Sequence, residues 1–203
     1  YSGSSGGNPG KNREILVGDT LYFDANDGND GYELWAHDTS NHSTWQVADI
    51  NSGNLNSNIG WYMEMILVGD TIYFDAEGGN DGHELWAHDT SNHSTWQAAD
   101  IHSCAGCSSQ PGYYMEILVG DTLYFSASSA INNIANGHEL WAHDTSNAST
   151  WQVADINSGS SGSNPGEYMG IILVGDTLYF NAYGGNGGQE LWAMKIEHSI
   201  TYD

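Results

Sequence analysis

Four segments of the chain share one order of apolar and polar positions. The second segment reads ILVGDTIYFDAEGGNDGHELWAHDTSNHSTWQAADI, and near-copies of it precede and follow. The glycine after the Leu-Val pair recurs at spacings of 51, 51 and 55 residues, at Gly18, Gly69, Gly120 and Gly175. The tryptophan of the Glu-Leu-Trp motif recurs at spacings of 51, 55 and 51, at Trp35, Trp86, Trp141 and Trp192. A period near 50 residues is typical of a radial or stacked array of one supersecondary unit.

Each copy predicts four short strands. In the second copy the strands are expected at residues 62–68, 71–76, 83–89 and 95–101, and the second of them is rich in β-branched and aromatic residues. Two short turns, at 69–70 and 91–94, and a Gly/Asn-rich loop at 78–82 separate them. No window carries helical periodicity over 10 residues, so the sequence predicts an all-β protein.

Four-stranded antiparallel units repeated at this length are typical of propeller blades. Large residues stand at consecutive positions in Leu-Tyr-Phe and Glu-Leu-Trp, which indicates sheets covered on both faces. Residues 1–10 match residues 157–166, so the chain starts and ends at the same point of the repeat. We therefore expect one domain of four repeats (1–50, 51–101, 102–156 and 157–203) that closes as a four-bladed β-propeller-like ring. A β-solenoid, or half of a larger propeller completed by a second chain, is the alternative.

The segment from Asn164 to Trp192, with Leu-Val-Gly-Asp-Thr-Leu-Tyr-Phe-Asn-Ala and Gln-Glu-Leu-Trp, resembles the bacterial ELWxxDGT repeat family. Its similarity to kelch-type propeller repeats is weaker. The ELWxxDGT resemblance implies large extracellular or surface proteins with propeller-like repeats, and it implies no activity. The chain departs from the family pattern in one turn, where Asp-Thr-Ser stands at 38–40, 89–91 and 144–146 in place of Asp-Gly-Thr.

The charge balance narrows the possible partners. Three basic residues stand against 26 acidic ones, for a formal charge of −23, so nucleic acid and anionic membranes should repel the chain. The acidity indicates either a solvated surface or a surface partly neutralised by divalent cations. No run of 18 apolar residues exists, which excludes a transmembrane helix. The start at Tyr1, without methionine or hydrophobic leader, predicts a processed product or a fragment.

The Asp/Asn/Gly-rich loop after the second strand is the candidate calcium site. Its alternation of oxygen-bearing side chains and glycines can fold around a hard cation, although such hairpins are more often plain turns. The loop matches an EF-hand poorly. The candidate ligands in the first two copies are Asp24, Asn26, Asp27, Asp30, Asp75, Glu77 and Asp81.

Two features favour a secreted or extracellular location. N-glycosylation sequons stand at one equivalent position in three copies, at Asn41, Asn92 and Asn147. The two cysteines, Cys104 and Cys107, form a CxxC pair for which a local disulfide in an oxidising compartment is favoured over a redox centre or half a zinc site.

Two recurrent acid and histidine patterns bear on catalysis. The glutamate before Leu-Trp (Glu33, Glu84, Glu139, Glu190) is expected to be a buried acceptor for backbone N–H groups between blades. Fourfold repetition singles out none of these acids as a glycosidase carboxylate. His37, His88 and His143 are expected between blades or at the solvent edge, with a ring of metal ligands as the alternative. The segment from His83 to His88 is not a zincin motif, because its histidines are five apart on a strand.

Candidate ligand contacts are the positions that differ between copies. The residue before each of those glutamates varies, and Trp61 stands beside a linker without an evident counterpart; the set is Tyr32, Trp61, His83, His138 and Gln189. The other tryptophans are expected mostly between blades. The sequence thus predicts a non-enzymatic extracellular scaffold that binds glycans, calcium or copies of itself. A soluble multivalent lectin is the alternative, and a polysaccharide-active enzyme is third.

Overall fold

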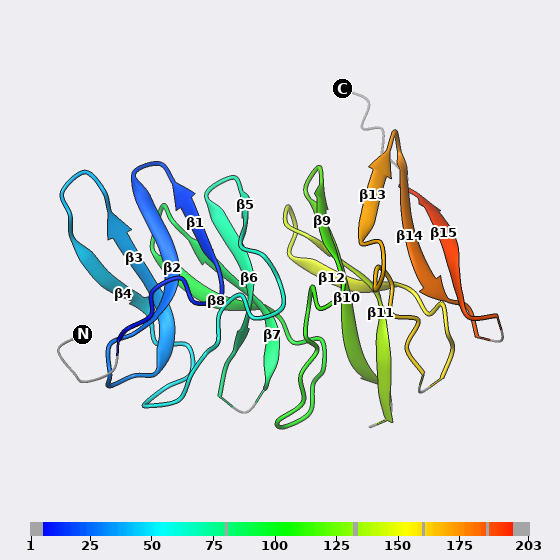
Figure 1. The fold of residues 1–203 in the computed structure, drawn as a ribbon, viewed down its shortest axis with the longest axis horizontal. Helices are drawn as coiled ribbons and strands as arrows, with labels where there is room; N and C mark the ends of the chain where they lie inside the picture. The colour runs from blue at the N-terminus through cyan, green and yellow to red at the C-terminus, as the bar shows by residue number, and fades with distance from the viewer. Residues whose placement is uncertain (1–5, 80, 132–133, 160, 186, 197–203) are drawn as a thin grey trace.

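Four antiparallel sheets stand side by side in chain order in the computed structural model, which describes residues 6–79, 81–131, 134–159, 161–185 and 187–196 (Figure 1). We call them blades 1 to 4. Blade 1 contains β1 (Glu14–Val17), β2 (Thr20–Asn26), β3 (Tyr32–Asp38) and β4 (Thr44–Ala48). Blade 2 contains β5 (Ile66–Val68), β6 (Thr71–Glu77), β7 (His83–Asp89) and β8 (Ser94–Ala99). Blade 3 contains β9 (Glu116–Val119), β10 (Thr122–Ile131), β11 (Ile134–Asp144) and β12 (Ser149–Ala154), and blade 4 contains β13 (Ile171–Val174), β14 (Thr177–Tyr183) and β15 (Gln189–Lys195).

Each blade is a meander whose neighbouring strands pair in sequence order. The first hairpin closes through the predicted two-residue turn, with Val17 opposite Thr20 in blade 1. Gly18 opens that turn with a φ of 59°, and its equivalents Gly69, Gly120 and Gly175 have φ of 59°, 59° and 63°. Only glycine adopts this conformation without strain, so the recurring glycine sets the hairpin register.

The first strand of a blade is shorter than the sequence predicts. β5 begins at Ile66 and not at residue 62, because the backbone N–H groups of Tyr62 and Met63 donate to a carboxylate oxygen of Asp75. The residues before β5 therefore belong to the linker that enters the blade.

Every blade has two apolar faces, and each face has a fixed composition. We call the face toward the following blade the forward face; in blade 1 it carries Ile15, Val17, Tyr22, Leu34 and Ala36. The rear face of blade 2 packs against it with Leu67, Ile72, Phe74, Ala76 and Trp86. The forward face of blade 2 meets the rear face of blade 3 in the same way, through Tyr73, Leu85 and Ala87 against Leu123, Phe125 and Ala127. Burial of both faces explains the consecutive large residues of the repeat.

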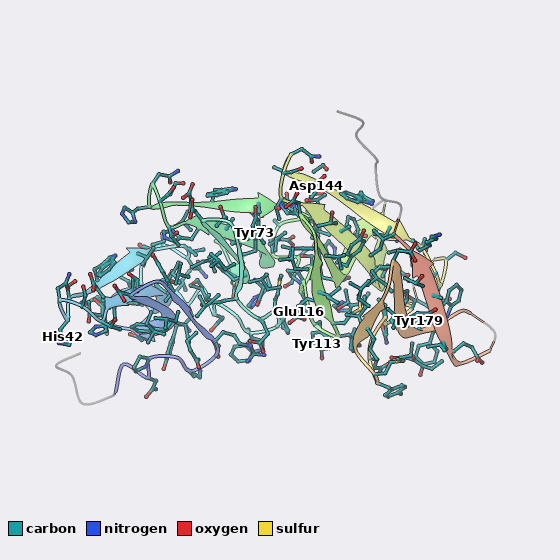
Figure 2. The ribbon with its side chains drawn as sticks, turned by 90° about the horizontal axis from the view of Figure 1, so that it is seen from above. His42, Tyr73, Tyr113, Glu116, Asp144 and Tyr179 are labelled. Carbon is teal, nitrogen blue, oxygen red and sulfur yellow. A yellow bond between two sulfur atoms is a disulfide. The ribbon has the colours of Figure 1, made fainter. Side chains whose placement is uncertain are left out.

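The array is open, which corrects the expectation of a closed ring. Blades 1 and 4 form opposite ends of the row (Figure 1). In Figure 2, His42 of blade 1 and Tyr179 of blade 4 lie at opposite ends of the molecule. On the forward face of blade 4, Leu191 is 68 % exposed, whereas the equivalent Leu34 is fully buried. The rear face of blade 1 and the forward face of blade 4 therefore lie apart, at the two ends of the row (Figure 1).

The two long edges of the row are formed by different turns and loops (Figure 1). The turns that open each blade, such as β1–β2 and β9–β10, lie along the upper edge in Figure 1, and the linkers with the β2–β3 and β6–β7 loops lie along the lower edge. We call the lower edge the linker edge. Among the described residues, no helix is long and apolar enough to cross a membrane.

Candidate functional site at the linker edge

A buried glutamate fastens each linker to the blade that precedes it. Glu33 accepts the backbone N–H of Ile50 at 2.6 Å and that of Ser57 at 3.1 Å. Glu84 and Glu139 repeat this arrangement with Ile101 and Ser109, and with Ile156 and Ser163. The expectation of a buried acceptor is confirmed at these three positions, whereas Glu190 is exposed. Burial raises the pKa of Glu33 and of Glu84 to about 7, against the lowering effect of these hydrogen bonds.

A second buried polar position fastens each linker to the blade that follows it. Asp24 accepts the N–H of Asn12, and Asp75 accepts those of Tyr62 and Met63. The equivalent acceptor in blade 3 is the Ser126 hydroxyl, which accepts the backbone N–H of Tyr114. In blade 4 it is the amide oxygen of Asn181, which accepts the backbone N–H groups of Tyr168 and Met169. The second residue after each of the linker glycines Gly10, Gly60, Gly112 and Gly166 is therefore held in a fixed direction at the linker edge.

In blades 2 and 4, this second buried polar residue also contacts the residue before the glutamate of the Glu-Leu-Trp motif. The Oδ2 atom of Asp75 lies 2.9 Å from Nδ1 of His83, and Nε2 of His83 lies 3.8 Å from Glu77. Burial raises the pKa of Asp75, and the His83 contact opposes that effect. In blade 4 the equivalent pair is Asn181 and Gln189, whose side chains also hydrogen-bond. Because an amide pair replaces the aspartate–histidine pair at the same place, the contact holds the side chain in position in both blades.

A continuous row of rings runs along the linker edge across blades 2 and 3. The ring centroid of Tyr62 lies 4.9 Å from that of His83 and 5.2 Å from that of Tyr113. Tyr113 in turn lies 4.7 Å from Tyr114 and 5.1 Å from His138. Offset and edge-to-face contacts at these distances are favourable and hold the rings rigid. Figure 2 places Tyr113 near the middle of the array.

Gln110 links two members of the row. Its amide nitrogen donates to the Tyr62 hydroxyl at 3.0 Å, and its amide oxygen lies 3.2 Å from Nε2 of His138. Because an amide oxygen only accepts, Nε2 of His138 carries the proton. Burial lowers the pKa of His138 to about 4, so the ring is neutral at physiological pH.

The linker edge beyond the row of rings carries different contacts in blade 1 and in blade 4. In blade 1, the Lys11 ammonium stands 4.8 Å from the ring centre of Tyr32 and 5.7 Å from that of Trp61, which is a cation–π arrangement. In blade 4, the Gln189 amide donates to Glu167 at 2.7 Å. Three exposed rings lie in the three successive linkers: Trp61 is 49 % exposed, Tyr113 of the row 47 % and Tyr168 72 %.

All five predicted contact residues thus belong to one edge. His83 and His138 are rings of the row, Tyr32 and Trp61 both contact Lys11, and Gln189 donates to Glu167. Sequence reasoning missed Tyr62, Tyr113, Tyr114 and Tyr168, and it treated Trp61 as having no counterpart. The linker glycines Gly10, Gly60, Gly112 and Gly166 give the alignment that would have found them, since Trp61 and Tyr113 each directly follow one.

The calcium candidates are distributed over separate places. Asp24 and Asp75 are buried and accept linker N–H groups. Asp27 accepts the N–H groups of Asn29 and Asp30 within its own loop, which lowers its pKa. Glu77 lies beside His83. Among the described residues, these acids do not form a group of three that lies within reach of one ion. Calcium binding stays a prediction.

His88 and His143 lie between blades, whereas His37 lies on the rear face of blade 1 at the end of the row. Nδ1 of His37, His88 and His143 lies 2.7, 2.9 and 2.7 Å from the hydroxyl of Thr44, Thr95 and Thr150. His102, Cys104 and Cys107 are the one potential metal-ligating group of three in the described part of the chain. Its two sulfur atoms are joined in a disulfide, with 5.2 Å between the Cα atoms, so they are not thiolate ligands.

The sequons lie in the β3–β4, β7–β8 and β11–β12 turns. Asn41, Asn92 and Asn147 are exposed, and their amide nitrogens donate to the aspartate at the start of the turn, at 2.6 to 2.7 Å. Their glycosylation stays a prediction. The second tryptophan of each repeat corrects the expectation of an inter-blade position, because Trp45, Trp96 and Trp151 lie partly exposed on the outer strands β4, β8 and β12.

Comparisons with known proteins bear on the fold. No protein-family model and no curated protein matches the chain. The extracellular domain of a one component system from B. thetaiotaomicron matches with a TM-score of 0.51 and 14 % identity, over 92 % of this chain and 22 % of that one. The GH74 xyloglucanase from Xanthomonas campestris matches with a TM-score of 0.51 and 14 % identity, over 91 % of this chain and 28 % of that one. The fold is therefore of the β-propeller type, and the chain spans less than a third of the length of either protein.

Proposed function

We propose that the chain is a non-enzymatic extracellular module whose linker edge binds an extended neutral glycan. The observation that carries the proposal is the row of contacting rings around Tyr113, together with one exposed ring in each of three successive linkers, Trp61, Tyr113 and Tyr168. Aromatic faces stack on the C–H faces of sugar rings, and a rigid row of them can contact successive sugars.

The charge of the chain narrows the class of glycan. At a formal charge of −23, sulfated and uronic-acid polysaccharides would be repelled, as would any other polyanion. Neutral hydroxyl groups, in contrast, suit the amides and imidazoles beside the row, namely Gln110, His138 and Gln189. The proposal does not include hydrolysis, because Glu33, Glu84 and Glu139 are buried and already accept backbone donors.

An extended site is favoured over a multivalent lectin with one equal site per blade. The four residues before the Glu-Leu-Trp motifs differ in their partners: Tyr32 contacts a lysine, His83 an aspartate, His138 a glutamine and Gln189 a glutamate. Equal sites would require equal surroundings. An extended site predicts that affinity rises with oligosaccharide length, whereas separate sites predict several equivalents of a short sugar per chain.

The test is binding to a panel of neutral polysaccharides, xyloglucan among them, followed by calorimetry with oligosaccharides of increasing length. The triple variant Trp61→Ala/Tyr113→Ala/Tyr168→Ala should weaken binding at least about tenfold, the equivalent of about 1.4 kcal/mol. The matched control is Trp45→Ala/Trp96→Ala/Trp151→Ala, which removes three exposed rings from the outer strands and should leave affinity unchanged. Equal losses in both variants, or no binding to the whole panel, would overturn the proposal.

A further inference from the structure

The forward face of blade 4 is an apolar face that no described blade covers. It carries Ile172, Val174, Tyr179, Leu191 and Ala193, the same residue types in the same register as the buried forward faces of blades 1, 2 and 3. On blade 4, Ile172, Val174 and Leu191 are exposed, whereas Leu34, Leu85 and Leu140 at the Leu191 position are buried.

The rear face of blade 1 is the complementary face, and no other blade in the described part of the chain packs on it; Leu21, Trp35 and His37 are partly exposed there, whereas Phe23 and Ala25 are buried. It carries Leu21, Phe23, Ala25, Trp35 and His37, the residue types that blade 3 presents to blade 2 as Leu123, Phe125, Ala127, Trp141 and His143. All five blade 1 residues line a cavity of about 770 Å³ that opens at this end of the row. In the internal interfaces, the forward face of the preceding blade covers this surface.

We propose that a second copy of this chain docks here head to tail, with its blade 4 forward face on the blade 1 rear face of the first. The chain forms the same kind of interface three times within itself, from faces with matching residues, so the contact continues an interface that the structure already shows. This association involves the two ends of the row, and it is independent of the proposed glycan site at the linker edge.

Two contacts of the docked pair follow from the internal interfaces. Tyr22 lies 5.4 Å from His88, and Tyr73 lies 5.4 Å from His143, so Tyr179 of one copy should pack on His37 of the other. Glu190 is exposed where Glu33 accepts the N–H of Ser57, and the residue equivalent to Ser57 at the start of the chain is Gly7. Glu190 should therefore accept the N–H of Gly7 from the second copy.

The contact is heterologous, because a forward face meets a rear face and not its own equivalent. Two copies that close on each other would form a ring of twice four blades, eight in all. The formal charge of −23 on each copy opposes association, and dissolved salt screens that repulsion. Association should therefore strengthen with ionic strength, as expected when apolar faces make the contact.

The test is the mass of the full chain by light scattering and sedimentation, over about a hundredfold range of concentration and at two salt concentrations. Leu191→Glu places a charge on the forward face, and His37→Glu places one on the rear face. Each variant alone should raise the dissociation constant at least about thirtyfold, as loss of an interface hot spot does. Leu55→Glu is the matched control, because Leu55 is 55 % exposed in the linker after blade 1. This variant should leave the dissociation constant unchanged.

Mixing the two variants separates this proposal from other dimers. The His37→Glu chain keeps an intact forward face and the Leu191→Glu chain keeps an intact rear face, so their mixture should form a heterodimer where neither forms a homodimer. Unchanged thermal unfolding of each variant would show that folding is intact. A monomeric wild-type chain under all conditions, or a Leu191→Glu chain that dimerises normally, would overturn the proposal.

Discussion

His88 of blade 2 packs on Tyr22 of blade 1, with 5.4 Å between ring centroids and 50° between ring planes. The imidazole is fully buried, and Nδ1 lies 2.9 Å from the Thr95 hydroxyl. Burial lowers the pKa of His88 to about 4, and the nearby His93 also lowers it. The inter-blade interface therefore contains a histidine that must stay neutral.

The first prediction concerns pH and His88→Met. Copy four already has methionine at this position, as Met194, so the substitution suits the interface. The folded-state pKa lies below the unfolded value of about 6.5, so wild-type stability is complete above that pH and falls as pH drops toward about 4. The variant should gain roughly 1–2 kcal/mol relative to wild type between about pH 7.5 and about pH 5. Denaturant unfolding at both pH values measures the difference, and a difference that does not change with pH would contradict the assignment.

The second prediction concerns the buried glutamates. Glu84→Ala leaves the N–H groups of Ile101 and Ser109 without their acceptor and should cost about 2–4 kcal/mol of unfolding free energy. Glu190→Ala is the control, because Glu190 is exposed in the isolated chain and should cost less than about 0.5 kcal/mol at high dilution.

The Glu84 variant also has a predicted pH dependence. Burial raises the pKa of Glu84 to about 7, above the unfolded value of 4.5. Its contribution is therefore complete below pH 4.5 and is lost as pH rises through about 7. The deficit of Glu84→Ala should shrink between about pH 5 and about pH 8, and a deficit that grows over that range would reverse the sign of the assigned shift.

The third prediction compares two glycines. Gly82 has a φ of 66°, and an added Cβ atom would overlap the backbone carbonyl of Cys107 in the next linker. Gly69 has a φ of 59° with no atom within 4 Å of such a Cβ. Both alanine variants carry the left-handed strain of about 1 kcal/mol, so Gly69→Ala should cost about that and Gly82→Ala about 3 kcal/mol or more. Equal unfolding free energies would mean that the linker moves away without cost.

The fourth prediction concerns the disulfide. Cys104 and Cys107 enclose a loop with a sequence separation of 3, so Cys104→Ala/Cys107→Ala should cost about 2 kcal/mol or less. The linker between blades 1 and 2 keeps its fold without cysteines, which supports the small effect. A reducing agent should lower the wild-type midpoint by the same amount and leave the variant unchanged. A larger loss would assign the disulfide a role in folding.

The blades could be predicted from the sequence because the residues of each repeat determine how its own strands pair. The Gly18 turn and the consecutive apolar residues of β2 and β3 are local signals of a sheet covered on both faces. Ring closure could not be predicted, because it depends on the angle between blades, which no residue pattern within one blade specifies. Matching ends establish equal phase only.

The candidate site could be predicted in part. The position before the glutamate was informative because it differs between copies while the Glu-Leu-Trp motif after it does not, and the structure places Tyr32, His83, His138 and Gln189 on one edge. The aromatic partners were missed because the segment from Gly60 to Gly69 is one residue longer than that from Gly112 to Gly120, which hides the equivalence of Trp61 and Tyr113. Asp24 and Asp75 resemble loop ligands in sequence, and only the fold shows that they are buried acceptors of backbone N–H groups.

The shared composition of the forward faces also has a consequence for how the chain reaches this structure. Any forward face can accept any rear face during folding, so blade 1 can capture blade 3 or blade 4 before blade 2 is in place. The linkers oppose this mispairing because a short connection favours neighbours. Refolding should then be slowed by misordered blades that must separate, and the chain should exchange blades between molecules at high concentration.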